Sequence, residues 1–226
     1  NPLGEQQGRA PADLYIASDA RAGAIALAEA VRASGYRPSG WRTPELRKEP
    51  ISSPPDRNEF PPDGNNADPR NVVAALDAVI PKDWTVVSGG AHFAGIAVTH
   101  MYGRKAEQVH IINEFGAIGS AFSCAIGMAA ARNDGKVLLI EGNGSLMMHI
   151  QELETLRRHG IRMLICAVND GGYGAEVHKF RAQGYNPDES KHGRGDIAAI
   201  ARGFGLRGEK VDRLGRFREL FAAHER

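Results

Sequence analysis

The 226-residue sequence lacks the features that define several common protein classes. It has only two cysteines, Cys124 and Cys166, and both lie in apolar segments, which predicts buried free thiols rather than a disulfide or an iron–sulfur cluster. Its formal net charge is +1, so no charge excess favours binding to nucleic acid or to a membrane surface. The longest nearly apolar run, residues 117–131, is interrupted by glycine and serine and is too short to span a bilayer.

Two further sequence patterns are missing, a secretory signal and a dinucleotide-binding motif. The start of the chain, Asn1 to Gly4, shows no secretory signal pattern, and we expect a cytoplasmic protein. No Gly-x-Gly-x-x-Gly follows an apolar strand and opens a helix, and no glycine turn has an acidic residue at the ribose position. A dinucleotide-binding oxidoreductase, which would have a similar doubly wound sheet, is therefore disfavoured. The hydrophobic content of 42% is enough to fill a core.

The composition divides the chain into three pieces. Residues 13–18 are an apolar run typical of a buried strand, and the alanine-rich residues 20–34 predict a helix that ends at Gly35. This strand–helix unit, residues 1–35, is too small to be stable alone. Prolines are dense in residues 36–68, which predicts a linker because proline disrupts both helix interiors and sheet ladders. The third piece is residues 69–226.

Apolar strand patterns and helical patterns alternate in the third piece. We expect strands near residues 84–88, 109–112, 136–140 and 162–168, and helices near residues 69–79, 118–132, 147–159, 196–203 and 217–226. Such alternation predicts an α/β fold, a doubly wound parallel sheet with helices on both faces.

Two oxygen-bearing turns follow neighbouring strands of this sheet. Residues 137–140 run into Gly142-Asn143-Gly144-Ser145, and residues 163–168 run into Asn169-Asp170-Gly171-Gly172-Tyr173. Parallel strands deliver their carboxyl ends to one edge, where open α/β sheets bind ligands. Magnesium prefers hard oxygen ligands, often shared with substrate phosphates, and glycines let a diphosphate approach the backbone closely. The two turns therefore predict a magnesium–diphosphate site.

These turns resemble the fingerprint of thiamine-diphosphate-dependent enzymes, a Gly-Asp-Gly triplet followed by Asn-Asn. The usual Asp and Asn are exchanged here, as Asn143 and Asp170. Upstream, residues 90–92 resemble the diphosphate-contacting Gly-x-His turn of acetolactate synthase-like enzymes. Residues 116–119 resemble the segment that places a bulky apolar side chain, here Ile118, under the thiazolium ring. The resemblance covers about residues 68–205, with a weaker match at residues 12–34.

The resemblance implies thiamine diphosphate and Mg²⁺ as cofactors of a decarboxylase or carboligase that acts on 2-oxo acids. It implies Asn143, Asp170 and the Gly172 carbonyl as metal ligands. It implies cofactor contacts from Gly90, His92, Ile118, Gly142, Asn143, Gly144, Ser145, Asp170, Gly172 and Tyr173. Tyr173, Glu176 and His178 lie on the segment that can face substrate in this family, while His149, His178 and His192 show no metal-ligand spacing.

Each of these residues also has a structural interpretation. Asn143 and Ser145 can cap a helix, and Asp170 can be a turn aspartate. His92 is equally compatible with a partly buried capping residue, and Ile118 with a core position. The metal-site interpretation is favoured because both turns follow strands at the family's spacing.

In this family a carboxylate from a pyrimidine-binding domain activates the cofactor, and no position of this sequence matches it. The resemblance thus implies that residues 1–35 are the last unit of a central domain, and that residues 69–226 are a cofactor-diphosphate domain truncated at its end. The resemblance also implies that this chain alone would be catalytically inactive. Expected partners are a pyrimidine-binding domain of the same or another chain, and further copies in a homodimer or homotetramer joined through the helix after Ile118, whose alanines allow close packing. A subunit of a split phosphonopyruvate- or sulfopyruvate-type decarboxylase, or a non-catalytic binding fragment, remains an alternative.

Overall fold

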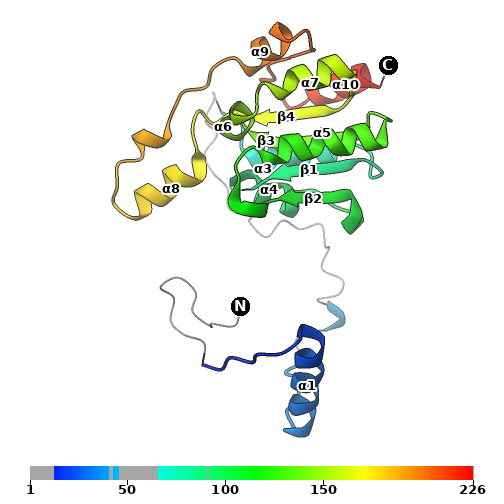
Figure 1. Cartoon of the computed structure of the whole chain (residues 1–226), viewed down its shortest axis with the longest axis vertical. Coiled ribbons are helices and arrows are strands. Elements are labelled where there is room, and N and C mark those ends of the chain that lie inside the picture. The colour runs from blue at the N-terminus through cyan, green and yellow to red at the C-terminus, as the bar shows by residue number, and fades with distance from the viewer. Residues whose placement is uncertain (1–12, 41–42, 46–65, 91, 226) are drawn as a thin grey trace. The chain divides into compact units, whose positions relative to one another are not determined.

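The computed structural model describes residues 13–40, 43–45, 66–90 and 92–225. The chain forms two compact units, Asn1–Pro50 and Ile51–Arg226 (Figure 1). Most of the proline-rich segment lies outside the described residues. No helix in the described part of the chain is long and apolar enough to cross a membrane.

The first unit contains α1 (Ala20–Ala33), as predicted. The Asp19 side chain begins the helix by accepting the N–H groups of Arg21 and Ala22 at 3.1 and 3.0 Å. The strand predicted at residues 13–18 is wrong, because these residues form no strand and Leu14 is 76% exposed. A strand needs a neighbour to bond its N–H and C=O groups, and no described residue of this unit supplies one.

The second unit is built on a parallel sheet, which confirms the predicted fold class. Its described strands are β1 (Thr85–Gly89), β2 (Val109–Ile112), β3 (Val137–Gly142) and β4 (Leu164–Val168), in the order β2-β1-β3-β4. All pairs are parallel, with Val86 opposite both Val109 and Leu138. Each strand lies within two residues of its predicted bounds, because strands buried on both faces appear in the sequence as continuous apolar runs.

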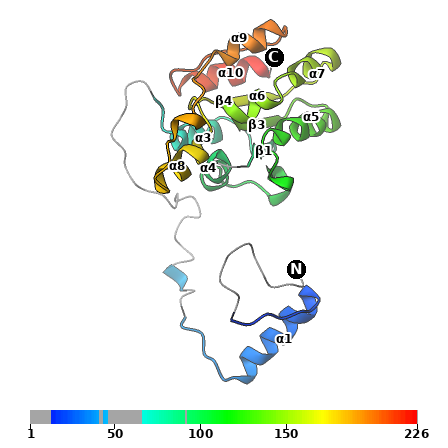
Figure 2. The same cartoon turned by 60° about the vertical axis from the view of Figure 1, so that its left-hand side comes forward.

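Helices cover both faces of this sheet (Figures 1 and 2). Alternate side chains of β3 point to opposite faces, so Val137 and Leu139 join one apolar cluster and Leu138 and Ile140 the other. The first cluster includes side chains of α5 (Ser120–Arg132), α7 (Glu152–His159) and α9 (Ile197–Gly203). The second includes side chains of α3 (Pro69–Asp77), α4 (His92–His100) and α10 (Arg216–His224).

Two parts of the helix prediction differ from the structure. The helix expected at residues 147–159 is divided into α6 (Asn143–Met148) and α7. Helices α4 and α8 (Gly174–Ala182) are additional to those predicted. Both follow glycine-rich turns, and neither has the one-sided apolar pattern by which helices are recognised.

The alanines of helix α5 do not all face outward, as the predicted contact with another chain would require. Ala121, Ala125 and Ala129 are buried on the sheet, so they cannot form the contact with another chain that the sequence suggests. Ala130 is exposed on the outer face of the helix. Cys124 is also exposed there, which contradicts the predicted burial of its thiol.

The strand order locates the ligand edge of the sheet. The chain runs from β1 to β2 on one side and then crosses to β3 and β4 on the other. The carboxyl ends of β1 and β3 therefore flank a topological switch point, where doubly wound sheets leave a crevice for ligands. His92 follows β1, and Asn143 follows β3.

Candidate functional site

The turn after β3 leads directly into α6. Gly142 precedes this helix, and no side chain caps it, so Asn143 and Ser145 are not the helix caps of the structural interpretation. Asn143 is only 2% exposed, and its Oδ1 is buried without a hydrogen-bond partner. An unpaired buried carbonyl oxygen is costly in free energy. A bound cation or hydrogen-bond donor at Asn143 Oδ1 would remove this cost.

The turn after β4 carries a second set of oxygens. Asp170 Oδ1 accepts the N–H of Gly172 at 3.2 Å, the bond expected of a turn aspartate, and this leaves Oδ2 for other contacts. The Asn169 side chain donates to the Arg194 carbonyl, while its own Oδ1 is buried without a partner. Gly171 has φ +81°, a left-handed conformation that favours glycine.

His92 sits at the start of α4, directly beyond β1. Its ring stacks on Phe93 at 5.2 Å and meets the edge of the His178 ring, also at 5.2 Å. Its Nδ1 is buried without a partner. Burial lowers the pKa of His92, and the charge of His178 lowers that pKa further, whereas the charge of Asp170 opposes both.

The two turns and the start of α4 surround one small cavity of about 40 Å³. Its lining consists of His92, Phe93, Ile118, Gly142, Gly144, Ser145, Gly172, Tyr173, Gly174, Ala175 and Glu176. Every expected cofactor contact except Gly90, Asn143 and Asp170 is in this set. Phe93, Gly174 and Ala175 are in it although no sequence pattern marks them.

The remaining expected residues lie around this cavity. Asn143 is buried, Asp170 lines a larger cavity beside it, and Gly90 packs against the Asn113 side chain. Ile118 is 39% exposed, so it is not the core residue of the structural interpretation. A side chain at Gly144 would lie 2.7 Å from the Tyr173 ring, which shows how closely the turns approach.

Glu141 is a buried residue next to the site that the sequence motifs do not mark. It lies in β3, is 2% exposed, and its Oε2 has no hydrogen-bond partner. Burial raises the pKa of its carboxyl group, and the Ser145 side chain and the Gly142 N–H oppose this in smaller measure. The signal for its burial is the strand alternation, since Val137, Leu139 and Glu141 share one face.

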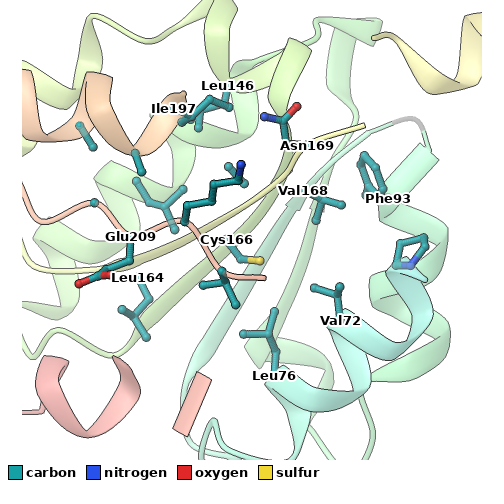
Figure 3. A pocket seen from close by; sticks show the side chains of 18 of the residues that line it. Val72, Leu76, Phe93, Leu146, Leu164, Cys166, Val168, Asn169, Ile197 and Glu209 are labelled. Carbon is teal, nitrogen blue, oxygen red and sulfur yellow. The ribbon is translucent and has the colours of Figure 1, made fainter. Parts of the chain in front are cut away.

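The larger cavity has a volume of about 1420 Å³ and extends along β4 (Figure 3). Figure 3 shows Cys166 and Val168 of β4 lining it together with Val72 and Leu76 of α3. Its size follows from the topology, because β4 ends the sheet and no described strand pairs with its outer edge. Burial in this apolar surrounding raises the pKa of Cys166 to about 12, which disfavours its thiolate form.

Comparison with known proteins agrees with this geometry. The family model “Thiamine pyrophosphate enzyme, C-terminal TPP binding domain” matches residues 90–225. The chain belongs to the thiamine pyrophosphate enzyme family. The match includes the turns after β3 and β4 and every residue that lines the small cavity.

Relatives in this family include synthases and decarboxylases. The chain is 30% identical over 200 residues to “Probable acetolactate synthase 2, chloroplastic” of Oryza sativa subsp. japonica, covering 82% of this chain and 30% of that protein. It is 30% identical over 141 residues to an alpha-keto-acid decarboxylase of Mycobacterium ulcerans, covering 58% of this chain and 24% of that protein. The chain thus spans less than a third of the length of these relatives.

The fold is also that of solved family members. A thiamine diphosphate-dependent 4-hydroxybenzoylformate decarboxylase from Rhodococcus jostii RHA1 superimposes with a TM-score of 0.66 at 24% identity, covering 75% of this chain and 32% of that one. Benzoylformate decarboxylase from Polynucleobacter necessarius superimposes with a TM-score of 0.64. These two similarities establish the fold alone.

Proposed function

We propose that this chain is the diphosphate-binding part of an acetolactate synthase-like decarboxylase or carboligase that uses thiamine diphosphate and Mg²⁺ on 2-oxo acids. The observation that carries the proposal is the meeting of two turns, Gly142–Ser145 and Asn169–Tyr173, around one small cavity at the switch point of the sheet. The family and the relatives support the reaction class.

The residues present fit a metal–diphosphate group. Among the described residues, no cluster of three or more His, Cys, Asp or Glu side chains could hold a metal ion. An ion here would instead be held by the Asn143 amide oxygen, the Asp170 carboxylate and the Gly172 carbonyl, together with phosphate oxygens. The unpaired Asn143 Oδ1 is an oxygen that such an ion would satisfy.

The chain's own groups would bind and orient the cofactor. Gly142 and Gly144 leave the backbone open to a phosphate, and Ser145 and His92 offer a hydroxyl and an imidazole to it. Ile118, which lines the cavity, would contact the thiazolium ring and position it. The bound cofactor supplies the nucleophilic carbon and the electron sink for decarboxylation. Tyr173 and Glu176 also line the cavity, on the segment that we expect to face substrate.

The small cavity alone is too small for a whole cofactor. Its volume of about 40 Å³ does not hold two aromatic rings, which supports the expectation that another domain supplies part of the wall. We therefore propose that this chain alone is inactive with 2-oxo acids and that a pyrimidine-binding domain completes the site. The match to the rice relative covers 82% of the chain, more than the second compact unit contains, which favours a single-chain enzyme over a split subunit.

Thermal unfolding tests the cofactor assignment. We expect thiamine diphosphate with Mg²⁺ to raise the melting temperature, and either component alone, or NADH, to raise it much less. Stabilisation by NADH would indicate a dinucleotide site, and no stabilisation by any ligand would indicate a non-catalytic fragment. Release of carbon dioxide from pyruvate, measured with and without thiamine diphosphate, would show whether the chain alone is active.

A further inference from the structure

Phe93 is buried where the two cavities meet. It follows His92 in α4 and is 8% exposed, yet neither apolar cluster of the described chain includes it. It lines both the small cavity and the larger one. The two cavities share the lining residues His92, Phe93, Gly172 and Gly174, and only the first two have side chains. The burial of Phe93 therefore belongs to the wall between the cavities and not to the core of the sheet.

The Phe93 ring contacts both the turn after β3 and the imidazole of His92. Its Cδ2 and Cε2 atoms each lie 3.2 Å from the point that a Cβ atom of residue 142 would occupy. Gly142 has φ −73°, so it needs no left-handed conformation, and its missing side chain leaves room for the ring. The rings of Phe93 and His92 are stacked, with centroids 5.2 Å apart and an angle of 28° between their planes. This separation is within the range of attractive aromatic pairs.

These contacts restrict the imidazole of His92. Its Nδ1 lies 2.7 Å and its Cε1 3.6 Å from the point that a Cβ atom of residue 174 would occupy, at the start of α8. Nδ1 has no hydrogen-bond partner among the described residues, so no bond to this atom sets the direction of the ring. The neighbouring rings set it instead, with Phe93 stacked on the imidazole and His178 meeting it at an edge.

We propose that Phe93 is a positioning residue of the cofactor site, which holds the His92 imidazole toward Gly174 by stacking on it and packing against Gly142. This inference rests on the proposed function, in which His92 offers its imidazole to the diphosphate. A flat ring suits this role because it presents a face to the whole imidazole, whereas a branched aliphatic side chain does not. Phe93 acts through His92 and need not touch the cofactor.

The test compares Phe93→Leu, which keeps an apolar side chain and removes the ring, with the unchanged full chain. Calorimetry measures the affinity for thiamine diphosphate at saturating Mg²⁺. We expect Phe93→Leu to weaken this affinity about 3- to 10-fold, which corresponds to the loss of one stacked ring pair. Phe93→Tyr keeps the ring and should retain more of the affinity than Phe93→Leu does.

Phe180→Leu is the matched control. It removes the ring contact between Phe180 and Tyr185, whose centroids are 6.3 Å apart, and Phe180 lines neither cavity. It should leave the affinity for thiamine diphosphate unchanged.

A substitution of His92 separates positioning from packing. We expect His92→Gln to weaken binding, and the double variant with Phe93→Leu to bind about as tightly as His92→Gln alone, because Phe93 then has no imidazole to hold. A purely structural role would give the same loss for Phe93→Leu with either residue at position 92. That result would overturn the inference.

A measurement without ligand tests the inference even if Phe93→Leu does not fold. One α-proton of Gly174 points along the direction of the missing Cβ atom, toward the His92 ring. Nuclear Overhauser spectroscopy of the unchanged chain should show a contact between this proton and the proton on His92 Cε1. Absence of the contact would mean that the imidazole is not held toward Gly174, and the inference would be wrong.

The calorimetry also separates this inference from the proposed function. If the unchanged chain binds thiamine diphosphate and Mg²⁺, and Phe93→Leu binds them equally well, the role of Phe93 is refuted and the proposed function stands. If the unchanged chain binds neither, the proposed function is refuted and the role of Phe93 with it.

Discussion

The carboxylate of Asp170 and the imidazole of His92 meet over Gly174. Asp170 Oδ2 and His92 Nδ1 lie 2.5 and 2.7 Å from the point that a Cβ atom of residue 174 would occupy. Asp170 belongs to the turn after β4, and His92 follows β1. The missing side chain of Gly174 therefore lets two of the proposed cofactor-binding segments approach each other.

Replacing Gly174 by alanine should push these segments apart. The added methyl group would overlap both atoms, so Asp170 or His92 must move, and we expect Mg²⁺-dependent affinity for thiamine diphosphate to fall at least about 10-fold. Gly203→Ala is the matched control, because Gly203 lies in a helix and a Cβ atom added there would meet no atom within 4 Å. That substitution should leave the affinity unchanged and stabilise the chain slightly. Equal affinities for the two variants would show that the approach of Asp170 to His92 is unimportant for binding.

The stability of the chain should depend on the protonation of His92. Its pKa is lowered in the folded chain, so the unfolded chain takes up this proton first as the pH falls. The associated stability is complete above the ordinary histidine pKa of about 6.5 and is lost as the pH falls toward the lowered folded value. Urea unfolding at pH 7.5 and 5.5 measures this loss. We expect His92→Gln to lose less stability than the unchanged chain between these values, and the exposed control His159→Gln to lose as much as the unchanged chain.

Sequence patterns predicted the sheet because its strands are buried on both faces. Residues 136–140 and 162–168 are continuous apolar runs, and the turns that follow parallel strands must meet at one edge. The meeting of the two turns at one small cavity could be inferred for this reason. The strand predicted at residues 13–18 was wrong because an apolar run is not sufficient to form a strand. A strand also needs a neighbouring strand that hydrogen-bonds with its backbone.

The close packing around Glu141 and Gly174 could not be inferred from the sequence in the same way. Strand alternation places Glu141 on the face of Val137 and Leu139, but a glutamate near the end of a strand is ordinarily solvated, and the packing of Gly89 against it shows that it is enclosed. Gly174 does not need a left-handed backbone, so no turn pattern marks it. Both depend on contacts between segments that are distant in the chain, and a single sequence does not contain these contacts.

We expect the intact protein to be at least a homodimer, with the outer face of α5 in the interface. The inner face of this helix packs on the sheet, and the outer face carries only small residues in its middle, including Gly127 and Ala130. Gly127→Arg should therefore raise the monomer fraction at micromolar concentration, measured by light scattering, without unfolding the chain. Ala74→Arg, at an exposed position of α3 on the opposite side of the sheet, should not. A full-length protein that is monomeric before substitution would contradict the expectation itself.

The exchange of Asn143 and Asp170 relative to the usual family pattern provides a test of the metal assignment. One amide and one carboxylate would still face the ion, so the formal charge at the metal is unchanged. Asp170→Asn removes the only carboxylate that we assign as a direct ligand and should weaken Mg²⁺-dependent cofactor binding by about 10- to 100-fold. Asn143→Asp adds a second negative charge beside the diphosphate and should weaken binding through repulsion.

The double substitution restores both the charge and the common arrangement of the two ligands. We expect it to bind Mg²⁺ and thiamine diphosphate more tightly than Asp170→Asn alone, with a coupling free energy of about 1 kcal/mol or more, because the two side chains would share one ion. Calorimetric titration of all four proteins measures this coupling. Glu107→Gln, at an exposed position away from the cavity, serves as a fifth protein that should bind as the unchanged chain does. Strictly additive losses would mean that Asn143 and Asp170 do not coordinate the same metal ion, and the proposed site would then be wrong.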